Sequence, residues 1–276
     1  MGLNQHKTVL ITGGTSNLGR ALVTCFADNN WVVHATTRNL LSNGTAPFSH
    51  PNVHYHQMDL ENPDSIKQTI AHISSTVNHL DLLINNAGFV LSGPLEGYTD
   101  EQMSRQMDVN FYGTVYAIRA ILPKMKQQQQ GSIINVSSLC GLTTFPMLSM
   151  YHASKWALEG FTESLMYEVE QFGITVKLVE PGGIRDNELA AEVEFGEQSL
   201  PEYQSLINQM HHSSWFPSFS TSAEVAKQLL QIATENTAQL RHQIGEDCTM
   251  LLHERFNHLA NEAYIVKTKG RIGGNG

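Results

Sequence analysis

The sequence contains little cysteine, little positive charge and no long apolar run, and each shortage excludes a class of protein. Its three cysteines, Cys25, Cys140 and Cys248, are far apart and odd in number, and no C-x-x-C pair exists. They predict a reduced, intracellular chain rather than a disulfide-bonded secreted domain. The first apolar run follows MGLNQHK, is too short to span a membrane and lacks a signal-peptide core. We therefore expect a cytoplasmic protein.

Positive charge is scarce, since 17 Lys and Arg stand against 26 Asp and Glu, which gives a formal net charge of -9 at pH 7. Extended binding to nucleic acid or to an anionic membrane needs a basic surface, so neither partner is expected. A bound metal is not expected either. His54 and His56 would project from one face of a strand, but no cysteine or third histidine stands at a ligand spacing from them.

What the sequence does contain is a regular alternation of short apolar runs and longer amphipathic ones. From Tyr151 to Phe172, apolar residues recur every three or four positions, as in a helix. Six short runs rich in β-branched residues fit strands buried on both faces, namely Val9–Ile11, Trp31–Ala35, Val53–Met58, Leu82–Ile84, Ser132–Val136 and Thr175–Val179. The alternation predicts an α/β fold, a doubly wound parallel sheet of the Rossmann type flanked by helices, in a single domain over residues 1–276.

Three segments break this alternation. Residues 40–51 are polar and predict a loop, and the glutamines at 127–130 predict a helix end before Gly131. Residues 186–220 contain helical stretches and aromatic side chains but no strand signal. At the C-terminus, the glycine-rich stretch from about 265 to 276 predicts a flexible tail.

The first predicted strand runs directly into a glycine-rich turn, Thr12-Gly13-Gly14-Thr15-Ser16-Asn17-Leu18-Gly19. Such a turn between a strand and a helix lets backbone N–H groups and the helix N-terminus face an anion such as a pyrophosphate. A plain strand-to-helix turn would have a similar sequence. The position after the first strand of an alternating chain favours dinucleotide binding.

Tyr151 and Lys155 are four residues apart on a predicted helix, so their side chains lie on one face. A free tyrosine has a pKa of about 10 and is a poor acid or base at neutral pH. A cation held nearby favours the phenolate and lowers that pKa, which makes the tyrosine usable in general acid–base catalysis. Surface Tyr–Lys pairs are common, so this spacing alone does not decide the function.

Further motifs supply the context for this pair. Ile133-Ile134-Asn135-Val136-Ser137-Ser138 ends one predicted strand, Asn85-Asn86-Ala87-Gly88 ends another, and Asn110 lies in Asp108-Val109-Asn110-Phe111-Tyr112-Gly113. Together with the glycine turn and the Y-x-x-x-K pair, these motifs have a characteristic order and approximate spacing. From Thr8 to about Gly245, the chain resembles the single-domain branch of the short-chain dehydrogenase/reductase family.

The resemblance implies roles for four side chains. Tyr151 would be the catalytic acid or base, and Lys155 would lower its pKa and bind the nicotinamide ribose. Ser138 would bind the substrate oxygen. Asn110 would hold a water molecule that links Lys155 to solvent and completes a proton relay.

It also implies a cofactor site along the strand ends. Asp59 would contact the adenine amino group and Leu60 would add a backbone contact, while Asn86, Ala87 and Gly88 would line the adenosine-ribose side. The remaining expected contacts come from the glycine turn, the Tyr–Lys pair and the segment after the sixth strand, namely Gly13, Thr15, Ser16, Asn17, Leu18, Gly19, Tyr151, Lys155, Pro181, Gly182 and Ile184.

The end of the second strand indicates which dinucleotide is preferred. NAD-preferring relatives place an acidic residue there, whereas this chain has Thr37 followed by Arg38. A guanidinium can pair bidentately with a 2′-phosphate and lie over the adenine. The sequence therefore favours NADP(H), with NAD(H) still possible, and the alternative is that Arg38 is a solvated loop residue.

Two positions depart from the family's pattern. Asn17 replaces the middle glycine of T-G-x-x-x-G-x-G, and we expect the turn to survive because asparagine tolerates positive φ. Asp186 stands where the family usually has a threonine near the nicotinamide carboxamide. Its carboxylate either faces the carboxamide or turns outward, and the outward orientation is favoured because it avoids a buried unpaired charge.

The leading hypothesis is an enzyme that interconverts a carbonyl and an alcohol on a small, partly apolar molecule. Nucleotide-sugar epimerases or dehydratases share Y-x-x-x-K, but they are longer chains with a larger C-terminal sugar-binding part. Asn85-Asn86-Ala87-Gly88 also argues against them. A cofactor-sensing regulator on the same fold typically lacks the full Asn–Ser–Tyr–Lys set.

The resemblance further implies a small helical substrate lid over about 186–220, whose apolar residues could also be ordinary core. It also implies a homodimer or homotetramer.

Overall fold

The computed structural model describes residues 6–39, 48–186, 193–197, 200–212 and 218–257. Its main sheet has seven parallel strands in the order β3-β2-β1-β4-β6-β7-β9. Their bounds are β1 Thr8–Ile11, β2 Val32–Thr37, β3 Val53–Gln57, β4 Leu82–Asn85, β6 Gly131–Val136, β7 Ile174–Pro181 and β9 Arg241–Ile244. All six predicted strands are present, and the doubly wound parallel sheet is confirmed.

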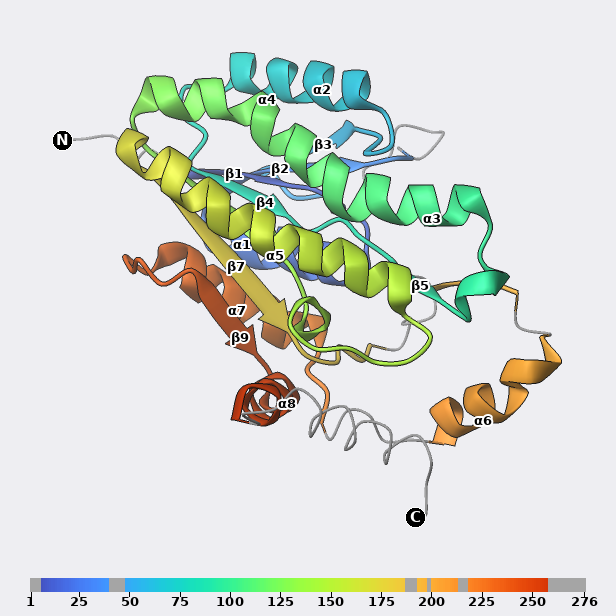
Figure 1. Cartoon of the computed structure of the whole chain (residues 1–276). Coiled ribbons are helices and arrows are strands. Elements are labelled where there is room, and N and C mark those ends of the chain that lie inside the picture. Colours follow the sequence, from blue (N-terminus) through green and yellow to red (C-terminus); the bar gives the residue numbers. More distant parts are fainter. Residues whose placement is uncertain (1–5, 40–47, 187–192, 198–199, 213–217, 258–276) are drawn as a thin grey trace.

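Helices cover both faces of this sheet (Figure 1). Helices α1 (Asn17–Asp28) and α7 (Ser222–Thr234) pack on one face, and α2 (Pro63–Thr76), α4 (Gly113–Gln128) and α5 (Ser149–Val169) pack on the other. The remaining helices are α3 Asp100–Met107, α6 Gln204–His212 and α8 Glu246–Asn257. Both faces are therefore buried, as the continuous apolar strand sequences require.

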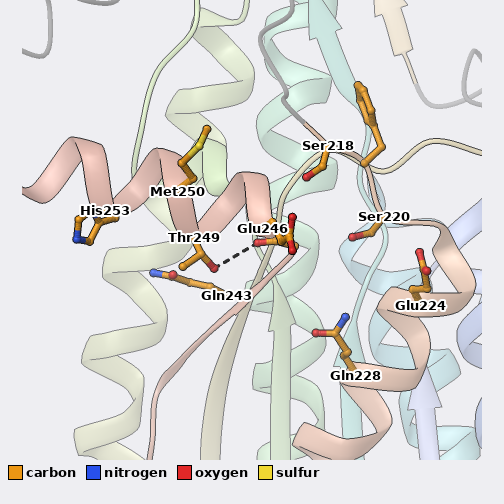
Figure 2. A pocket seen from close by; sticks show the side chains of 11 residues that line it. Ser218, Ser220, Glu224, Gln228, Gln243, Glu246, Thr249, Met250 and His253 are labelled. Carbon is orange, nitrogen blue, oxygen red and sulfur yellow. Dashed lines mark hydrogen bonds between the residues drawn. The ribbon is translucent and has the colours of Figure 1, made fainter.

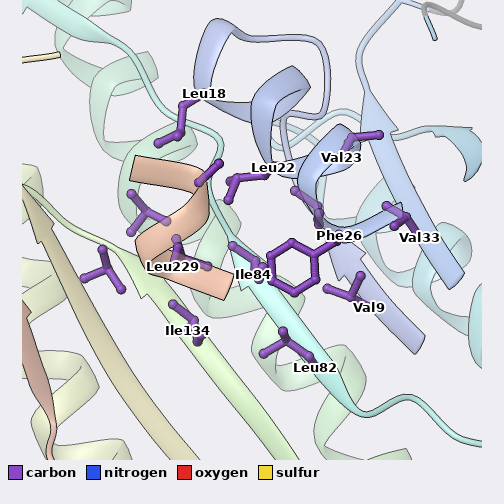
Figure 3. Packing of buried hydrophobic residues seen from close by; sticks show 14 of the residues in the cluster. Val9, Leu18, Leu22, Val23, Phe26, Val33, Leu82, Ile84, Ile134 and Leu229 are labelled. Atoms are coloured by element: carbon purple, nitrogen blue, oxygen red, sulfur yellow. The ribbon is translucent and has the colours of Figure 1, made fainter. Parts of the chain in front are cut away.

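Apolar side chains fill the layer between the sheet and helices α1 and α7 (Figure 3). Phe26 of α1, Leu229 of α7 and Ile84 of β4 are all fully buried there. Each such side chain contributes roughly 1.5–3 kcal/mol relative to remaining exposed. This packing fixes the N-terminal end of α1 relative to the ends of the central strands.

Two parts of the sheet structure were not predicted. Strand β9 was missed because Arg241-His242-Gln243-Ile244 carries one apolar side chain, a composition that an edge strand tolerates. The expectation of no strand within 186–220 was wrong for β8 (Val193–Phe195), which pairs in parallel with β5 (Val90–Ser92). A three-residue strand has too short a pattern to show in sequence, and its partner is distant.

Much of the predicted lid segment lies outside the described residues, including 187–192, 198–199 and 213–217. Residues 40–47 of the predicted loop and the predicted tail from 265 to 276 also lie outside them. In the described part of 186–220, β8 is tied to the body of the protein. Gln102 donates to the carbonyl oxygen of Phe195, and Gly196 N–H donates to the carbonyl oxygen of Ser92.

Candidate active site

The glycine turn joins β1 to α1 at the point where the strand order reverses, with β2 on one side of β1 and β4 on the other. Gly13 has φ +68°, and a Cβ there would lie 2.8 Å from the Cα of Ala87. Only glycine fits both the conformation and this close approach. Ser16 then caps α1, since its Oγ accepts a hydrogen bond from Gly19 N–H at 3.0 Å.

Hydrogen bonds fasten this turn to the end of β4. The Oγ1 of Thr12 accepts from the N–H groups of Asn86 and Ala87, at 3.0 and 3.1 Å. In return, the side chain of Asn86 donates to the carbonyl oxygen of Thr12 at 3.0 Å. The two strand ends therefore form one rigid edge, which is where α/β sheets of this kind bind ligands.

Asn17 does not adopt the positive φ expected to explain its place in the glycine turn. Asn17 is the first residue of α1, and the non-glycine residues with positive φ in the described chain are Asn30, Gln129 and Met147. Tolerance of positive φ is therefore not what admits an asparagine here. Its Oδ1 instead accepts a hydrogen bond from the guanidinium of Arg20 at 2.7 Å.

A cavity of about 740 Å³ lies along the ends of β1, β2 and β4. Predicted cofactor residues line it, namely Gly13, Thr15, Ser16, Asn17, Thr37, Arg38, Leu60, Ala87 and Gly88. Thr15 and Thr37, which line it near the end of β2, are uncharged, and their hydroxyls lie 3.1 Å apart. Asp59 is not among the lining residues, and its Oδ1 accepts from Glu61 N–H at 3.0 Å.

Charged side chains gather at the rim of this first cavity. The guanidinium of Arg38 lies 3.4 Å from Glu61, with their side chains 55% and 35% exposed. Arg105 of α3 also contacts Glu61, at 3.1 Å, and contacts Glu194 of β8 at 2.5 Å. Both arginines therefore approach one carboxylate, and strand β8 is held against the rim.

A second cavity of about 300 Å³ adjoins the first, with which it shares Ser16, Gly88, Phe89 and Val193. Its polar lining includes Ser138, Tyr151 and Lys155. The predicted residues Leu18, Asn86, Pro181, Gly182 and Ile184 line it as well. Most of the remaining wall is apolar, formed by Phe89, Val90, Val136, Leu139, Leu148, Val193 and Phe219.

Lys155 is buried beneath Tyr151 on α5. Its ammonium donates to the carbonyl oxygen of Val136 at 2.9 Å and lies 5.9 Å from the centre of the Tyr151 ring. Burial lowers the pKa of Lys155 to about 8, an effect that Cys140 and Glu159 oppose. Whether Lys155 keeps its positive charge near neutral pH therefore depends on the groups buried around it.

Asn110 is held in a π-helical turn, Asp108–Tyr112, between α3 and α4. Its amide donates to the carbonyl oxygen of Phe89 at 3.0 Å and to the hydroxyl of Ser154 at 3.2 Å, and its Oδ1 accepts from Phe89 N–H at 3.0 Å. A Cβ on Gly88 would lie 3.2 Å from this Oδ1 and 3.8 Å from the Lys155 ammonium. Gly88 thus lies between Asn110 and Lys155, close to both.

Sequence reasoning missed His152, the residue after Tyr151. Its Nε2 accepts from Phe145 N–H at 2.8 Å and its Nδ1 donates to the carbonyl oxygen of Cys140 at 2.8 Å. Burial lowers the pKa of His152, which fits this neutral form. The ring fixes the loop after Ser138 against α5. A histidine beside a tyrosine carries no sequence signal for this role.

The carboxylate of Asp186 turns outward. It accepts hydrogen bonds from the backbone N–H of Ser222, at 3.1 Å, and from the hydroxyl of Ser222, at the first turn of α7. Asp186 lines neither of the two cavities. The outward orientation favoured from the sequence is the one that the structure has.

A third hollow, of about 770 Å³, lies between α7, α8 and the end of β9 (Figure 2). Its wall includes Glu224, Gln243 and Glu246 beside the apolar side chains of Phe219 and Met250. None of the predicted site residues lines it. Size alone therefore does not identify the site, whereas the two adjoining cavities hold the residues that can do chemistry.

Within the part of the chain that the structure describes, no group of three or more His, Cys, Asp or Glu side chains is arranged to hold a metal ion. No described helix is long and apolar enough to cross a membrane.

Comparisons with known proteins agree with this geometry. The profile of the family described as short chain dehydrogenase matches residues 7–197. A 3-ketodihydrosphingosine reductase from Bacteroides thetaiotaomicron is 37% identical over 193 residues, which cover 68% of this chain and 70% of the relative. Retinol dehydrogenase 8 from Homo sapiens is 37% identical over 202 residues, covering 69% of this chain and 64% of the relative.

Solved structures are similar over a larger share of the chain. A short-chain dehydrogenase from Streptomyces avermitilis superposes with a TM-score of 0.84 and 26% identity, covering 99% of this chain and 100% of that one. ElxO with NADP bound has a TM-score of 0.73 and 28% identity, covering 87% of this chain and 96% of that one. The similarity in fold thus extends over most of the chain.

Proposed function

Because the chain belongs to the short-chain dehydrogenase/reductase family, whose members include oxidoreductases acting on CH–OH with NAD(P), we propose that it is an NADP(H)-preferring enzyme that interconverts the carbonyl and the alcohol of a partly apolar molecule. One observation carries the proposal. Tyr151, Lys155 and Ser138 line an apolar cavity that adjoins the cavity at the glycine turn. A proton-transfer group and a dinucleotide cradle therefore meet in one cleft.

The first cavity fits a dinucleotide on two grounds. Gly13 and Gly88 line the cavity and have no side chain to cover their backbone there. The N-terminus of α1, capped by Ser16, points its N–H groups toward an anion. Gly13, Ser16 and Asn17 would hold the pyrophosphate, and Leu60 and Ala87 would hold the adenosine. When bound, the nicotinamide supplies or accepts a hydride.

The chain's own residues move the proton and orient the substrate. The Tyr151 hydroxyl donates a proton to the substrate oxygen during reduction and accepts it during oxidation. The positive charge of Lys155 stabilises the phenolate form of Tyr151 between these steps. Ser138 hydrogen-bonds the same substrate oxygen. Asn110 holds a water through which the Lys155 region exchanges protons with solvent.

The preference for NADP(H) is supported by charge at the rim. Thr37 ends β2 with a neutral side chain, in place of the acidic residue that NAD-preferring relatives have at this position. Arg38 follows it, and its side chain is more than half exposed and able to reach a ligand. ElxO and a short chain dehydrogenase from Burkholderia cenocepacia, both similar in structure, have been solved with NADP.

The proposed substrate class follows from the second cavity, whose walls are largely apolar around one polar corner. An apolar substrate body would pack on Phe89, Leu148 and Phe219, and its carbonyl would face Ser138 and Tyr151. A nucleotide sugar would leave its hydroxyls unpaired against these walls. That mismatch disfavours the epimerase or dehydratase alternative.

A panel of carbonyl compounds tests the proposal. Each apolar ketone or aldehyde is paired with a hydroxylated analogue of equal size, and consumption of NADPH and NADH is followed by absorbance. We expect turnover of apolar members with NADPH and weaker turnover with NADH. Turnover confined to the polar members, or equal use of both cofactors, would refute the substrate class or the cofactor preference respectively.

We also propose that the chain forms a homodimer or homotetramer through α4 and α5, which pack on the same face of the sheet. Exposed aromatic side chains support this, with Trp156 of α5 43% exposed and Tyr167 66% exposed. Gly160, between them on the helix, has open space around it. Light scattering of the purified chain measures the state, and a monomer would refute the proposal.

A further inference from the structure

Three carboxyl groups and one guanidinium gather beneath the catalytic residues. Arg241 of β9 contacts Glu159 of α5 at 3.0 Å, Glu163 of α5 at 2.7 Å and Glu180 of β7 at 3.5 Å. The Glu159 and Glu180 side chains are 5% and 0% exposed, whereas Glu163 is 44% exposed. The cluster therefore joins the helix that carries Tyr151 to the strand that ends at Pro181.

The charges in this cluster do not balance if every carboxyl group is ionised. Among the described residues, Arg241 is the one cation in contact with the two buried carboxyl groups. Both Glu180 oxygens lack a hydrogen-bond partner there, whereas Glu159 lacks one only at Oε1. A buried unpaired carboxylate is costly. Burial, and next the charge of Glu159, raise the pKa of Glu180 to about 8. Glu180 therefore keeps its proton at neutral pH.

Of the two buried carboxyl groups, Glu159 is the one better placed to carry a negative charge. Burial raises the pKa of Glu159 as well, and the guanidinium of Arg241 opposes that rise. The Arg241 contact at 3.0 Å is a hydrogen bond, while the 3.5 Å approach to Glu180 is not. The shared guanidinium therefore favours a negative charge on Glu159 and a proton on Glu180.

Glu159 acts on Lys155, which lies one helical turn before it on α5. The other titratable groups near the ammonium are Tyr151, on the same helix, and Cys140, in the turn after Ser138. Burial raises the pKa of the Cys140 thiol to about 12, so it is uncharged. From β6 the ammonium meets the Val136 carbonyl oxygen, which cannot titrate. Glu159 thus supplies the negative charge.

Building on the proposed function, we propose that Glu159 is a positioning residue for the reaction. Its negative charge, maintained by Arg241 and by a protonated Glu180, keeps Lys155 cationic at the pH where Lys155 must act on Tyr151. Without that charge, the buried ammonium loses its proton at lower pH. Tyr151 then loses the cation that makes it a usable acid or base.

The test compares two isosteric variants, Glu159→Gln and Glu180→Gln, in the full-length protein. The pH profile of kcat/KM for carbonyl reduction is measured for each. In Glu159→Gln, we expect the basic limb to move to lower pH by about one unit, the size of effect that a nearby charge has on a pKa. In Glu180→Gln, the limb stays where it is, because that group is already neutral. An unshifted limb in Glu159→Gln, or an equal shift in both, overturns the proposal.

A second measurement follows Lys155 without catalysis. Protein with isotope-labelled lysine Cε is titrated by NMR, and the Lys155 signal is identified by its loss in Lys155→Met. A lower Lys155 pKa in Glu159→Gln than in wild type supports the proposal, and an equal one overturns it. If Glu159→Gln does not fold, Arg241→Gln replaces it and should shift the same signal downward, with no shift counting against the proposal. A fully active Tyr151→Phe would refute the proposed function and leave this titration valid.

Discussion

Charged side chains occur at both ends of the cleft, but in opposite surroundings. At the cofactor rim, Arg38 and Glu61 are 55% and 35% exposed and 3.4 Å apart. Beneath Tyr151 and Lys155, Glu159 and Glu180 are almost or fully buried around Arg241. An exposed pair is worth about 0–1 kcal/mol, so a ligand phosphate can replace the carboxylate at little cost. In the buried cluster no ligand replaces a carboxylate. Its charges instead set the protonation state of neighbouring groups such as Lys155.

The largest effect should come from the buried end. Tyr151→Phe removes one hydroxyl at the cavity wall and leaves the ring packing, so the fold and cofactor affinity should persist. We expect kcat to fall by about 100- to 10,000-fold, the usual contribution of a positioned acid or base. Turnover is measured on a substrate from the carbonyl panel, with NADPH affinity by fluorescence as the control. A near-normal kcat would show that Tyr151 does not transfer the proton, so the buried end of the cleft would have no catalytic role to set against the rim.

A smaller, selective effect is expected at the rim. Arg38→Ala should weaken NADPH by ~1.5–3 kcal/mol, or roughly 10- to 150-fold, because a charge-assisted hydrogen bond to the 2′-phosphate is lost. NADH affinity should stay unchanged. Dissociation constants for both cofactors, measured by calorimetry, check this.

Glu61→Gln is the matched control, since it removes the partner of Arg38 and keeps the guanidinium. NADPH affinity should be retained or increased there. If both variants lost NADPH affinity equally, the exposed pair would be acting as a fixed unit, and the contrast with the buried cluster would fail.

The smallest effect is expected at Asp186, which lies near neither charge cluster and is bonded to Ser222 at the start of α7. Asp186→Thr should cost about 0.5–2 kcal/mol of unfolding free energy, the range for a lost helix cap. The ratio of the NADP⁺ and NADPH dissociation constants should not change. Denaturant unfolding and equilibrium binding measure the two quantities. A ratio that shifts toward NADPH would show that the carboxylate reaches the nicotinamide.

The six apolar strands and the placement of most site residues at one sheet edge could be predicted, because buried parallel strands and turn glycines have strong local patterns. Strand β9 could not, since Arg241 and Gln243 are polar and an edge position tolerates them. The burial of Glu180 and the hydrogen bonds of His152 also could not. Those depend on which residues the fold brings together from distant parts of the chain, and local sequence carries no record of them.

The hydrogen bonds between Thr12 and Asn86 also bear on the way the cleft forms during folding. They join residues 74 positions apart, and β1 pairs with β4 across a similar separation, as Val9 with Leu82. Contacts this distant carry a loop-closure cost before they stabilise the chain, so they slow folding. A growing polypeptide that ends before β4 has the glycine turn but only half of the cradle. A dinucleotide that contacts both halves would therefore bind the closed sheet selectively. It would raise the free energy of unfolding by RT ln(1 + L/Kd), where L is the free dinucleotide concentration.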